Sequence, residues 1–160
     1  MCLHTINKFP RIATKDIETY KVVAKADSFV CSPYRTQYKW ELNKVIKNKE
    51  NAKIVKRKFY RDGTKMETPE KEISRGFFHT YLDLDEAIKM QDYFQAARRI
   101  VDCVFVEHTI VKCIIPKGTV YYSGVDDSGL KCYASKRIIM TDIEVIKDGN
   151  WTITRKINLN

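Results

Sequence analysis

The chain has 160 residues, 44% of them hydrophobic and 31% charged, and its formal net charge is +9. This length suits one domain with a proper core, so we expect a single domain over residues 1–160. The composition excludes a disordered chain, no apolar run is long enough to span a membrane, and the N-terminus lacks the apolar core of a signal peptide. We therefore expect a cytoplasmic protein that makes no membrane contact.

The positive charge is concentrated in one segment. Residues 35–65 contain eleven Lys and Arg against three acids, a difference of +8, which is nearly the whole excess of the chain. A segment of this kind favours an anionic partner, because phosphate contacts release counterions and speed the encounter. The partner we expect is a nucleotide, a nucleic acid or an acidic protein surface.

The five cysteines are odd in number and form no close CxxC pair: Cys2, Cys31, Cys103, Cys113 and Cys132. This pattern predicts reduced and mostly buried thiols rather than a disulfide framework or a zinc site. A metal site built from Cys2 and His4 with His79 or His108 has no support from the spacing. We expect neither a metal nor another cofactor.

The first part of the chain predicts short strands. Residues 18–24 have the β-branched and aromatic content of an interior strand, and 29–31 are a further short strand. Residues 38–43 alternate between apolar and polar, which favours a strand with one buried face over a competing helix from Ser32. We expect 52–60 to return antiparallel, so that 35–65 form a basic hairpin or insertion, and 63–71 to be a loop.

The middle of the chain predicts a strand followed by the main helix. Residues 76–81 are short and aromatic, as in a buried strand. Asp83 then offers an N-cap oxygen, and Glu86 stands three residues on, as in a capping box. An apolar stripe, interrupted by Gln91, continues to Val101. We therefore predict an amphipathic helix over about 83–101.

The rest of the chain is rich in β-strand patterns separated by turn residues. We predict strands at 103–106, 108–115, 119–122, 131–134, 137–147 and 151–157. Strands without intervening helices are joined by short links only when they are antiparallel. The fold class that we predict is therefore α+β, with a mostly antiparallel twisted sheet or sheets and one main helix.

Two stretches resemble the second half of the ADP-ribosyltransferase fold. They are Phe77–Tyr81 before the helix and Val111–Thr119, which includes Ile-Ile-Pro-Lys-Gly-Thr. In that family a Ser-Thr-Ser strand leads to a helix, and a later strand carries Glu-x-Glu. Here His79, Thr80 and Tyr81 replace Ser-Thr-Ser, Lys21 stands where the first strand has Arg, and Lys112 falls on the catalytic Glu.

The resemblance implies a related sheet without the family's chemistry. The family's Glu stabilises positive charge that develops on the nicotinamide ribose, and a lysine at position 112 reverses that electrostatic effect. An active enzyme remains the alternative if the register is shifted. In that alternative Glu107 or Glu144 supplies the carboxylate, His79 takes part in proton transfer, and NAD is consumed.

The chain also resembles small proteins encoded by gut bacteria and their phages. The stretches concerned are residues 38–44, 78–80, 115–124 and 133–135. This second resemblance implies no particular activity. It leaves open a further alternative, in which the chain is a phage-encoded antagonist of a host factor.

Two groups of residues are our candidates for binding. The first would line a cleft for a phosphate-bearing ligand: Lys21, His79, Thr80, Tyr81 and Lys112. The second combines cations with aromatics that can hold nucleic acid or phosphate: Arg35, Lys39, Trp40, Lys56, Arg57, Lys58 and Tyr60.

Each group has a plainer interpretation. Lysines also protect a solvated edge hairpin from aggregation, and His79 suits a hydrogen-bonded core position. For Tyr121, Tyr122 and Tyr133 we favour half-buried strand positions over stacking platforms. The function that we expect is a small basic binding protein without catalysis, which depends on Lys21, His79 and Lys112 sharing one cleft.

Overall fold

The computed structural model describes residues 3–5, 9–26, 28–33, 39–49, 53–59, 62–100 and 107–159. Within these ranges it is a mostly antiparallel sheet with a single helix, α1 (Leu84–Ile100). The first strands are β1 (Leu3–Thr5), β2 (Arg11–Ile12), β3 (Ile17–Lys25), β4 (Val30–Cys31), β5 (Lys39–Trp40), β6 (Val45–Lys47) and β7 (Lys53–Phe59). The others are β8 (Lys65–Arg75), β9 (Phe78–Tyr81), β10 (Glu107–Ile115), β11 (Val120–Asp126), β12 (Lys131–Ser135), β13 (Arg137–Asp148) and β14 (Trp151–Lys156). The coarse prediction of an antiparallel α+β fold is confirmed.

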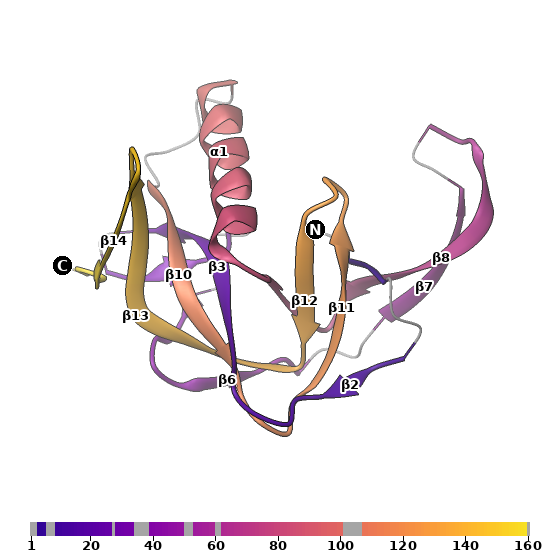
Figure 1. Cartoon of the computed structure of the whole chain (residues 1–160), viewed down its shortest axis with the longest axis horizontal. Coiled ribbons are helices and arrows are strands. Elements are labelled where there is room, and N and C mark those ends of the chain that lie inside the picture. Colours follow the sequence, from indigo (N-terminus) through magenta and orange to yellow (C-terminus); the bar gives the residue numbers. More distant parts are fainter. Residues whose placement is uncertain are drawn as a thin grey trace.

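The strands join in the order β14-β13-β10-β3-β9-β12-β11-β1-β8-β7, with the short strands β2, β4, β5 and β6 attached beside this path. The sheet curves around α1, which stands against one of its faces, and the β7–β8 hairpin projects away from the rest (Figure 1). β14 and β7 therefore lie at the two ends of the described sheet. Among the described residues no helix is long and apolar enough to cross a membrane.

Each face of the sheet has its own hydrophobic cluster. On the helix face, Ala87, Met90 and Phe94 of α1 pack with sheet residues that include Val22 and Ile110. On the opposite face, the cluster is made by Val23, Val30, Val111, Cys113, Ile138 and Met140. Neighbouring residues of a strand point to opposite faces, so the strand register determines which side chains meet.

The helix begins as predicted. The Asp83 carboxylate accepts a hydrogen bond from the Glu86 amide at 3.0 Å, as an N-cap does. The Glu86 carboxylate, however, accepts from the Lys131 amide at 3.0 Å, so it holds the helix start against β12. Gln91, which interrupts the apolar stripe, donates its amide to the His108 carbonyl at 2.9 Å and ties the helix to β10.

The pairing of the basic segment differs from the prediction. β7 pairs with β8, and β5 pairs with β4, so residues 38–43 and 52–60 are not the two arms of one hairpin. The loop predicted for 63–71 is wrong, because most of it belongs to β8. Pro69 suggested that loop, yet it lies where the β7–β8 register shifts, between the pairs Arg57↔Glu70 and Phe59↔Lys65. A strand tolerates proline at such an irregularity, where no ladder hydrogen bond is needed.

The other predicted strands are found with small changes in their bounds. The segment predicted at 18–24 is β3, which is interior because β10 and β9 pair with its two edges. The aromatic strand before the helix is β9, and the five later strands from 108 to 157 correspond to β10 to β14. The strand predicted at 103–106 lies outside the described residues. Cys31, Cys113 and Cys132 are free and buried, as expected.

Candidate functional site

The residues predicted to line one cleft are divided between the two faces of the sheet. Lys112 is directly opposite Tyr20 in the β3–β10 ladder, so these two side chains share a face. Lys21 follows Tyr20 in the chain and therefore points to the other face, where it approaches the Trp40 ring at 5.2 Å. Lys21 and Lys112 are neighbours in the sheet without being neighbours in a site.

The same alternation separates the residues of β9. Tyr81 is directly opposite Tyr20 and belongs to the helix-face cluster. His79, two residues earlier, shares that face, whereas Thr80 points to the face of Lys21. β9 and β10 are in one sheet but β3 lies between them. The described structure therefore does not assemble the single cationic cleft on which the sequence-based hypothesis depended.

Lys21 is a half-buried cation whose side chain points to the face opposite α1. Its Nζ donates a hydrogen bond to the His79 carbonyl oxygen at 2.6 Å. Burial lowers the pKa of Lys21 to about 8, since the charged form loses hydration that the apolar surroundings do not replace. The side chain is still mostly protonated at pH 7 and holds β3 to β9 across the ladder.

His79 is held in its neutral form. Burial is the main cause that lowers its pKa to about 3, and the nearby charge of Lys21 adds to the effect. Its Nδ1 is buried and finds no hydrogen-bond partner within the described part of the chain. An imidazole of this kind does not exchange protons near pH 7, so the arrangement does not support the proton-transfer role predicted for the enzyme alternative.

Lys112 is neutralised by a carboxylate. Its Nζ lies 3.4 Å from Oε1 of Glu18, and the Tyr20 hydroxyl donates to the same oxygen at 2.8 Å. The Tyr20 hydrogen bond and the charge of Lys112 lower the pKa of Glu18, while burial and Glu18 raise the pKa of Tyr20 to about 12. Lys112, which the predicted resemblance aligns with a catalytic glutamate, thus belongs to a partly exposed ion pair.

Glu107 and Glu144, the two glutamates of the enzyme alternative, both lie near Lys25, in a cluster of ion pairs that connects strands. Glu144 is 1% exposed, and its Oε1 accepts from Arg155 Nε at 2.6 Å. Its Oε2 accepts from the Thr109 hydroxyl at 3.0 Å and lies 3.8 Å from Lys25 Nζ, which is 3.7 Å from Glu107. Both oxygens of Glu144 are engaged, and all these residues lie on the face opposite His79. The cluster joins β3, β10, β13 and β14.

The predicted phosphate-binding residues are also separated. Lys56 and Lys58 are exposed on β7. Lys39 lies on β5 with its Nζ 4.3 Å from the centre of the Phe29 ring, and Trp40 is half-buried beneath Lys21. Arg35 and Tyr60 lie outside the described residues, as does the side chain of Arg57. Only Lys56 and Lys58 therefore share one described surface.

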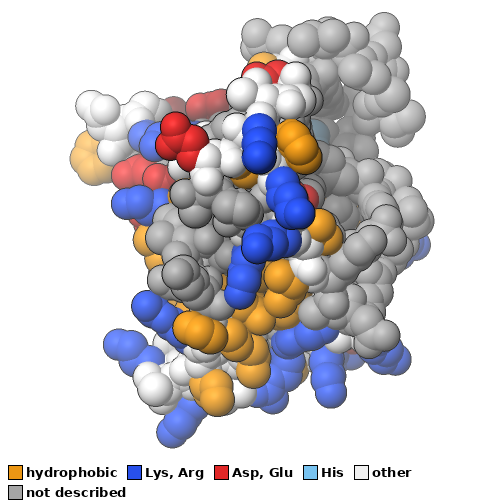
Figure 2. All heavy atoms as spheres, turned by 90° about the vertical axis from the view of Figure 1, so that its right-hand side faces the viewer, with side chains coloured by type: hydrophobic (Ala, Val, Ile, Leu, Met, Phe, Trp, Pro, Cys, Tyr) orange, Lys and Arg blue, Asp and Glu red, His pale blue; other side chains and the backbone are white. Residues whose placement is uncertain are grey.

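β8 adds two exposed lysines to this hairpin, Lys65 and Lys71, which are not among the candidate residues predicted from the sequence. We call Lys56, Lys58, Lys65 and Lys71 the hairpin lysines; all four are exposed. Lys56 and Lys71 are directly opposite in the β7–β8 ladder, and Lys65 is opposite Phe59, which is 54% exposed. On this side of the molecule, Lys and Arg side chains gather beside hydrophobic ones (Figure 2). Exposed Lys65 and Glu67 around buried Met66 were the signal that could have identified the strand.

Comparisons with protein-family models, with curated proteins and with solved structures found no match. The resemblance to ADP-ribosyltransferases therefore stays a prediction. Among the described residues no group of three or more His, Cys, Asp or Glu side chains is placed to hold a metal ion. The hairpin lysines are the candidate site with the clearest chemistry, because they present clustered charge to solvent.

Proposed function

We propose that this protein binds nucleic acid through phosphate contacts of the hairpin lysines. The observation that carries the proposal is the direct opposition of Lys56 and Lys71 on an exposed two-stranded hairpin. Like charges directly opposite in an antiparallel ladder repel each other. A phosphate that contacts these exposed lysines releases counterions, so binding is strongest at low salt.

The apolar residues of β7 support a nucleic acid rather than a small anion. Ile54, Val55 and Phe59 are 45%, 38% and 54% exposed on the same strand as Lys56 and Lys58. An extended surface of cations and exposed apolar groups suits a polymer, because successive phosphates and bases contact both kinds of residue. A mononucleotide and an acidic protein are the two other partners that the positive charge of the hairpin favours.

A solvated edge is the rival interpretation. β7 lies at one end of the described sheet, and lysines on an edge strand also prevent edge-to-edge aggregation. That role needs charge but no ligand. Under it, the protein binds oligonucleotides no better than any other surface with equal charge.

The test measures binding of a fluorescent 12-nucleotide single strand by anisotropy at about 50 mM salt, where phosphate contacts are strong. The hairpin variant is Lys56→Gln, Lys58→Gln and Lys65→Gln. The matched control is Lys15→Gln, Lys117→Gln and Lys147→Gln, which removes equal charge from three exposed lysines outside the hairpin. We expect the hairpin variant to bind about tenfold more weakly or worse, and the control to stay within about threefold.

Equal losses in both variants would show that net charge alone matters, and undetectable binding by the unaltered protein would end the proposal. Competition experiments with a mononucleotide and with an acidic peptide show whether either of these partners displaces the oligonucleotide. The enzyme alternative draws no support from the Glu144 cluster, whose oxygens are already engaged. Release of nicotinamide from NAD, lost in Glu144→Gln, is the result that would restore it.

A further inference from the structure

Two neighbouring tyrosines of β11 have different surroundings. Tyr122 packs edge-on against Phe77 on the helix face, with ring centres 5.4 Å apart. Tyr121 points to the opposite face, where its ring meets that of Tyr133 from β12 at 5.3 Å and 89°. Both are half-buried, so part of each ring is open to solvent. Nothing in the sequence distinguishes Tyr121 from Tyr122, whereas the strand register places them on opposite faces of the sheet.

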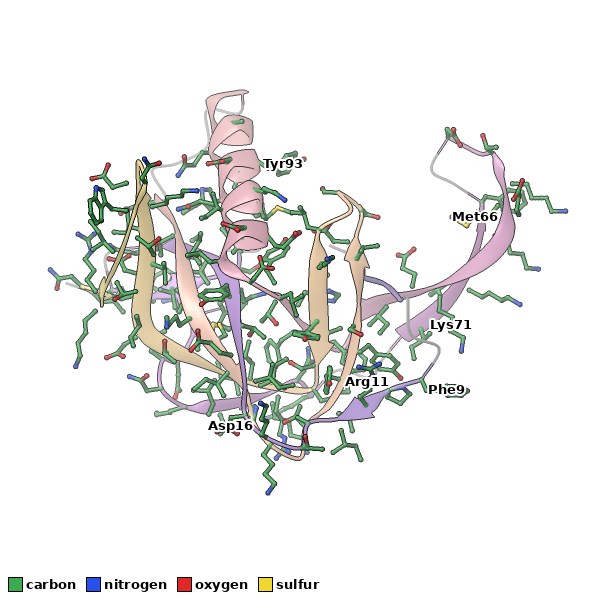
Figure 3. The ribbon with its side chains drawn as sticks, in the orientation of Figure 1. Phe9, Arg11, Asp16, Met66, Lys71 and Tyr93 are labelled. Carbon is green, nitrogen blue, oxygen red and sulfur yellow. The ribbon has the colours of Figure 1, made fainter. Side chains whose placement is uncertain are left out.

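Cations stand at both ends of this tyrosine pair. Arg11 of β2 is directly opposite Tyr121, and its charge acts on the Tyr133 hydroxyl, whose pKa burial raises and Arg11 lowers. Lys131 is two residues before Tyr133 on β12, so it points to the same face, and it is exposed. We call Arg11, Tyr121, Tyr133 and Lys131 the aromatic track. Figure 3 shows Arg11 and the exposed Phe9 beside β2.

Two hydroxyl groups beneath the track add a second observation. Ser135 is directly opposite Tyr121, and Thr80 is directly opposite Tyr133, so both share the face of the track. Each hydroxyl is buried and finds no hydrogen-bond partner within the described part of the chain. Buried hydroxyls are almost always satisfied by protein, water or ligand, so this face has unused polar capacity next to its aromatic rings.

We propose that the aromatic track is a second binding site, which stacks about two bases of a single-stranded nucleic acid on Tyr121 and Tyr133. That the ligand is a nucleic acid rests on the proposed function. The aromatic track itself is a different site from the hairpin lysines. Arg11 and Lys131 contact the phosphates on either side of the stacked bases. The track selects single strands, since a duplex keeps the faces of its bases stacked on one another.

The track and the hairpin lysines make separable contributions. Lys56 and Lys71 share the face of Ile73, which belongs to the helix-face cluster, whereas the track lies on the opposite face. β1 alone lies between β8 and β11 in the sheet. Stacking depends weakly on salt, and phosphate contacts depend strongly on it. Loss of the two tyrosine rings, with Arg11 and Lys131 kept, therefore weakens binding without changing the salt dependence.

The test compares the double variant Tyr121→Leu and Tyr133→Leu with Tyr93→Leu, which removes an exposed ring from α1 on the other face. We expect the double variant to bind the 12-nucleotide single strand about 10-fold to 100-fold more weakly, with an unchanged salt slope and unchanged binding to a duplex of the same sequence. Tyr93→Leu should stay within about twofold. The pair Tyr121→Phe and Tyr133→Phe keeps both rings, so it retains single-strand binding and controls for misfolding.

Single-strand affinity in the double variant equal to that of the unaltered protein, or an equal loss for duplex, would overturn the aromatic track. If the hairpin variant is weakened while the double variant is not, only this second site fails. If the unaltered protein binds no nucleic acid, the proposed function fails and the second site fails with it.

Discussion

The two ends of the sheet use similar residues in opposite ways. At the β14 end, Arg155 is directly opposite Glu144, and Lys25 lies near the same carboxylate. At the β7 end, Lys56 is directly opposite Lys71. The first arrangement compensates its charges within the protein, while the second places equal charges across the ladder. The strand register, rather than the number of basic residues, thus determines whether a cation faces a carboxylate or another cation across the ladder.

Breaking the compensated end should have the largest effect. Glu144→Ala removes the carboxylate that Arg155, Lys25 and the Thr109 hydroxyl share, and loss of hydrogen bonds to a buried charged group costs about 2 kcal/mol of unfolding free energy. Urea denaturation followed by circular dichroism measures this loss. Glu144→Gln keeps an acceptor for Thr109 and should lose less. A change below about 0.5 kcal/mol in Glu144→Ala would mean that the cluster does not stabilise the sheet.

Between the two ends of the sheet, the folded state disfavours the protonated form of His79. Its folded-state pKa of about 3 lies below the ordinary value of 6.5, so between these values the unfolded chain binds more protons than the folded one. Stability that is present above pH 6.5 is therefore lost as the pH falls toward 3. The slope contributed by this residue is about 1.4 kcal/mol per pH unit.

The test compares the unaltered protein with His79→Gln from pH 7 to pH 4.5 by urea denaturation. The carboxylates titrate in both proteins, so the difference between them isolates the histidine. We expect the unaltered protein to lose stability relative to the variant as the pH falls. Parallel curves would show that His79 takes up a proton as readily in the folded state as in the unfolded chain.

Introducing a cross-strand pair of opposite charges at the β7 end, like the pair at the β14 end, should have the smallest effect on stability and a large effect on binding. Lys56→Glu places a carboxylate directly opposite Lys71. A cross-strand pair of opposite charges should raise the unfolding free energy by a few tenths of a kcal/mol. The same change should weaken oligonucleotide binding more than Lys56→Gln does. Tighter binding in Lys56→Glu would contradict the account.

Much of the architecture could be predicted from local patterns. The aromatic run before Asp83, the N-cap and the apolar stripe determine β9 and α1, and alternating β-branched residues identify β3, β10 and β13. These signals are local, because each element's own residues carry them. The sequence does not predict β8, because Pro69 argues against a strand. Proline is compatible with a strand at a register shift, and that shift depends on the pairing with β7, which the local sequence does not show.

The site could be predicted only in part, because the face of a strand residue depends on its pairing. Lys21 and Lys112 both sit in correctly predicted strands, yet one register places them on opposite faces. The ion pairs of Glu144 connect residues up to 119 positions apart in the chain, from Lys25 to Glu144, which no spacing rule detects. Lys56 and Lys58 could be found from charge alone, whereas the pairing of Lys56 with Lys71 on β8 could not.

The salt dependence of oligonucleotide binding tests most directly whether the hairpin lysines contact phosphates. The slope of log K against log salt should be shallower by about 2 in Lys56→Gln, Lys58→Gln and Lys65→Gln than in the unaltered protein, since each lost contact to a single strand removes about 0.7. The matched control at Lys15, Lys117 and Lys147 should keep the slope of the unaltered protein. Equal slopes for the unaltered protein and the hairpin variant would contradict the account.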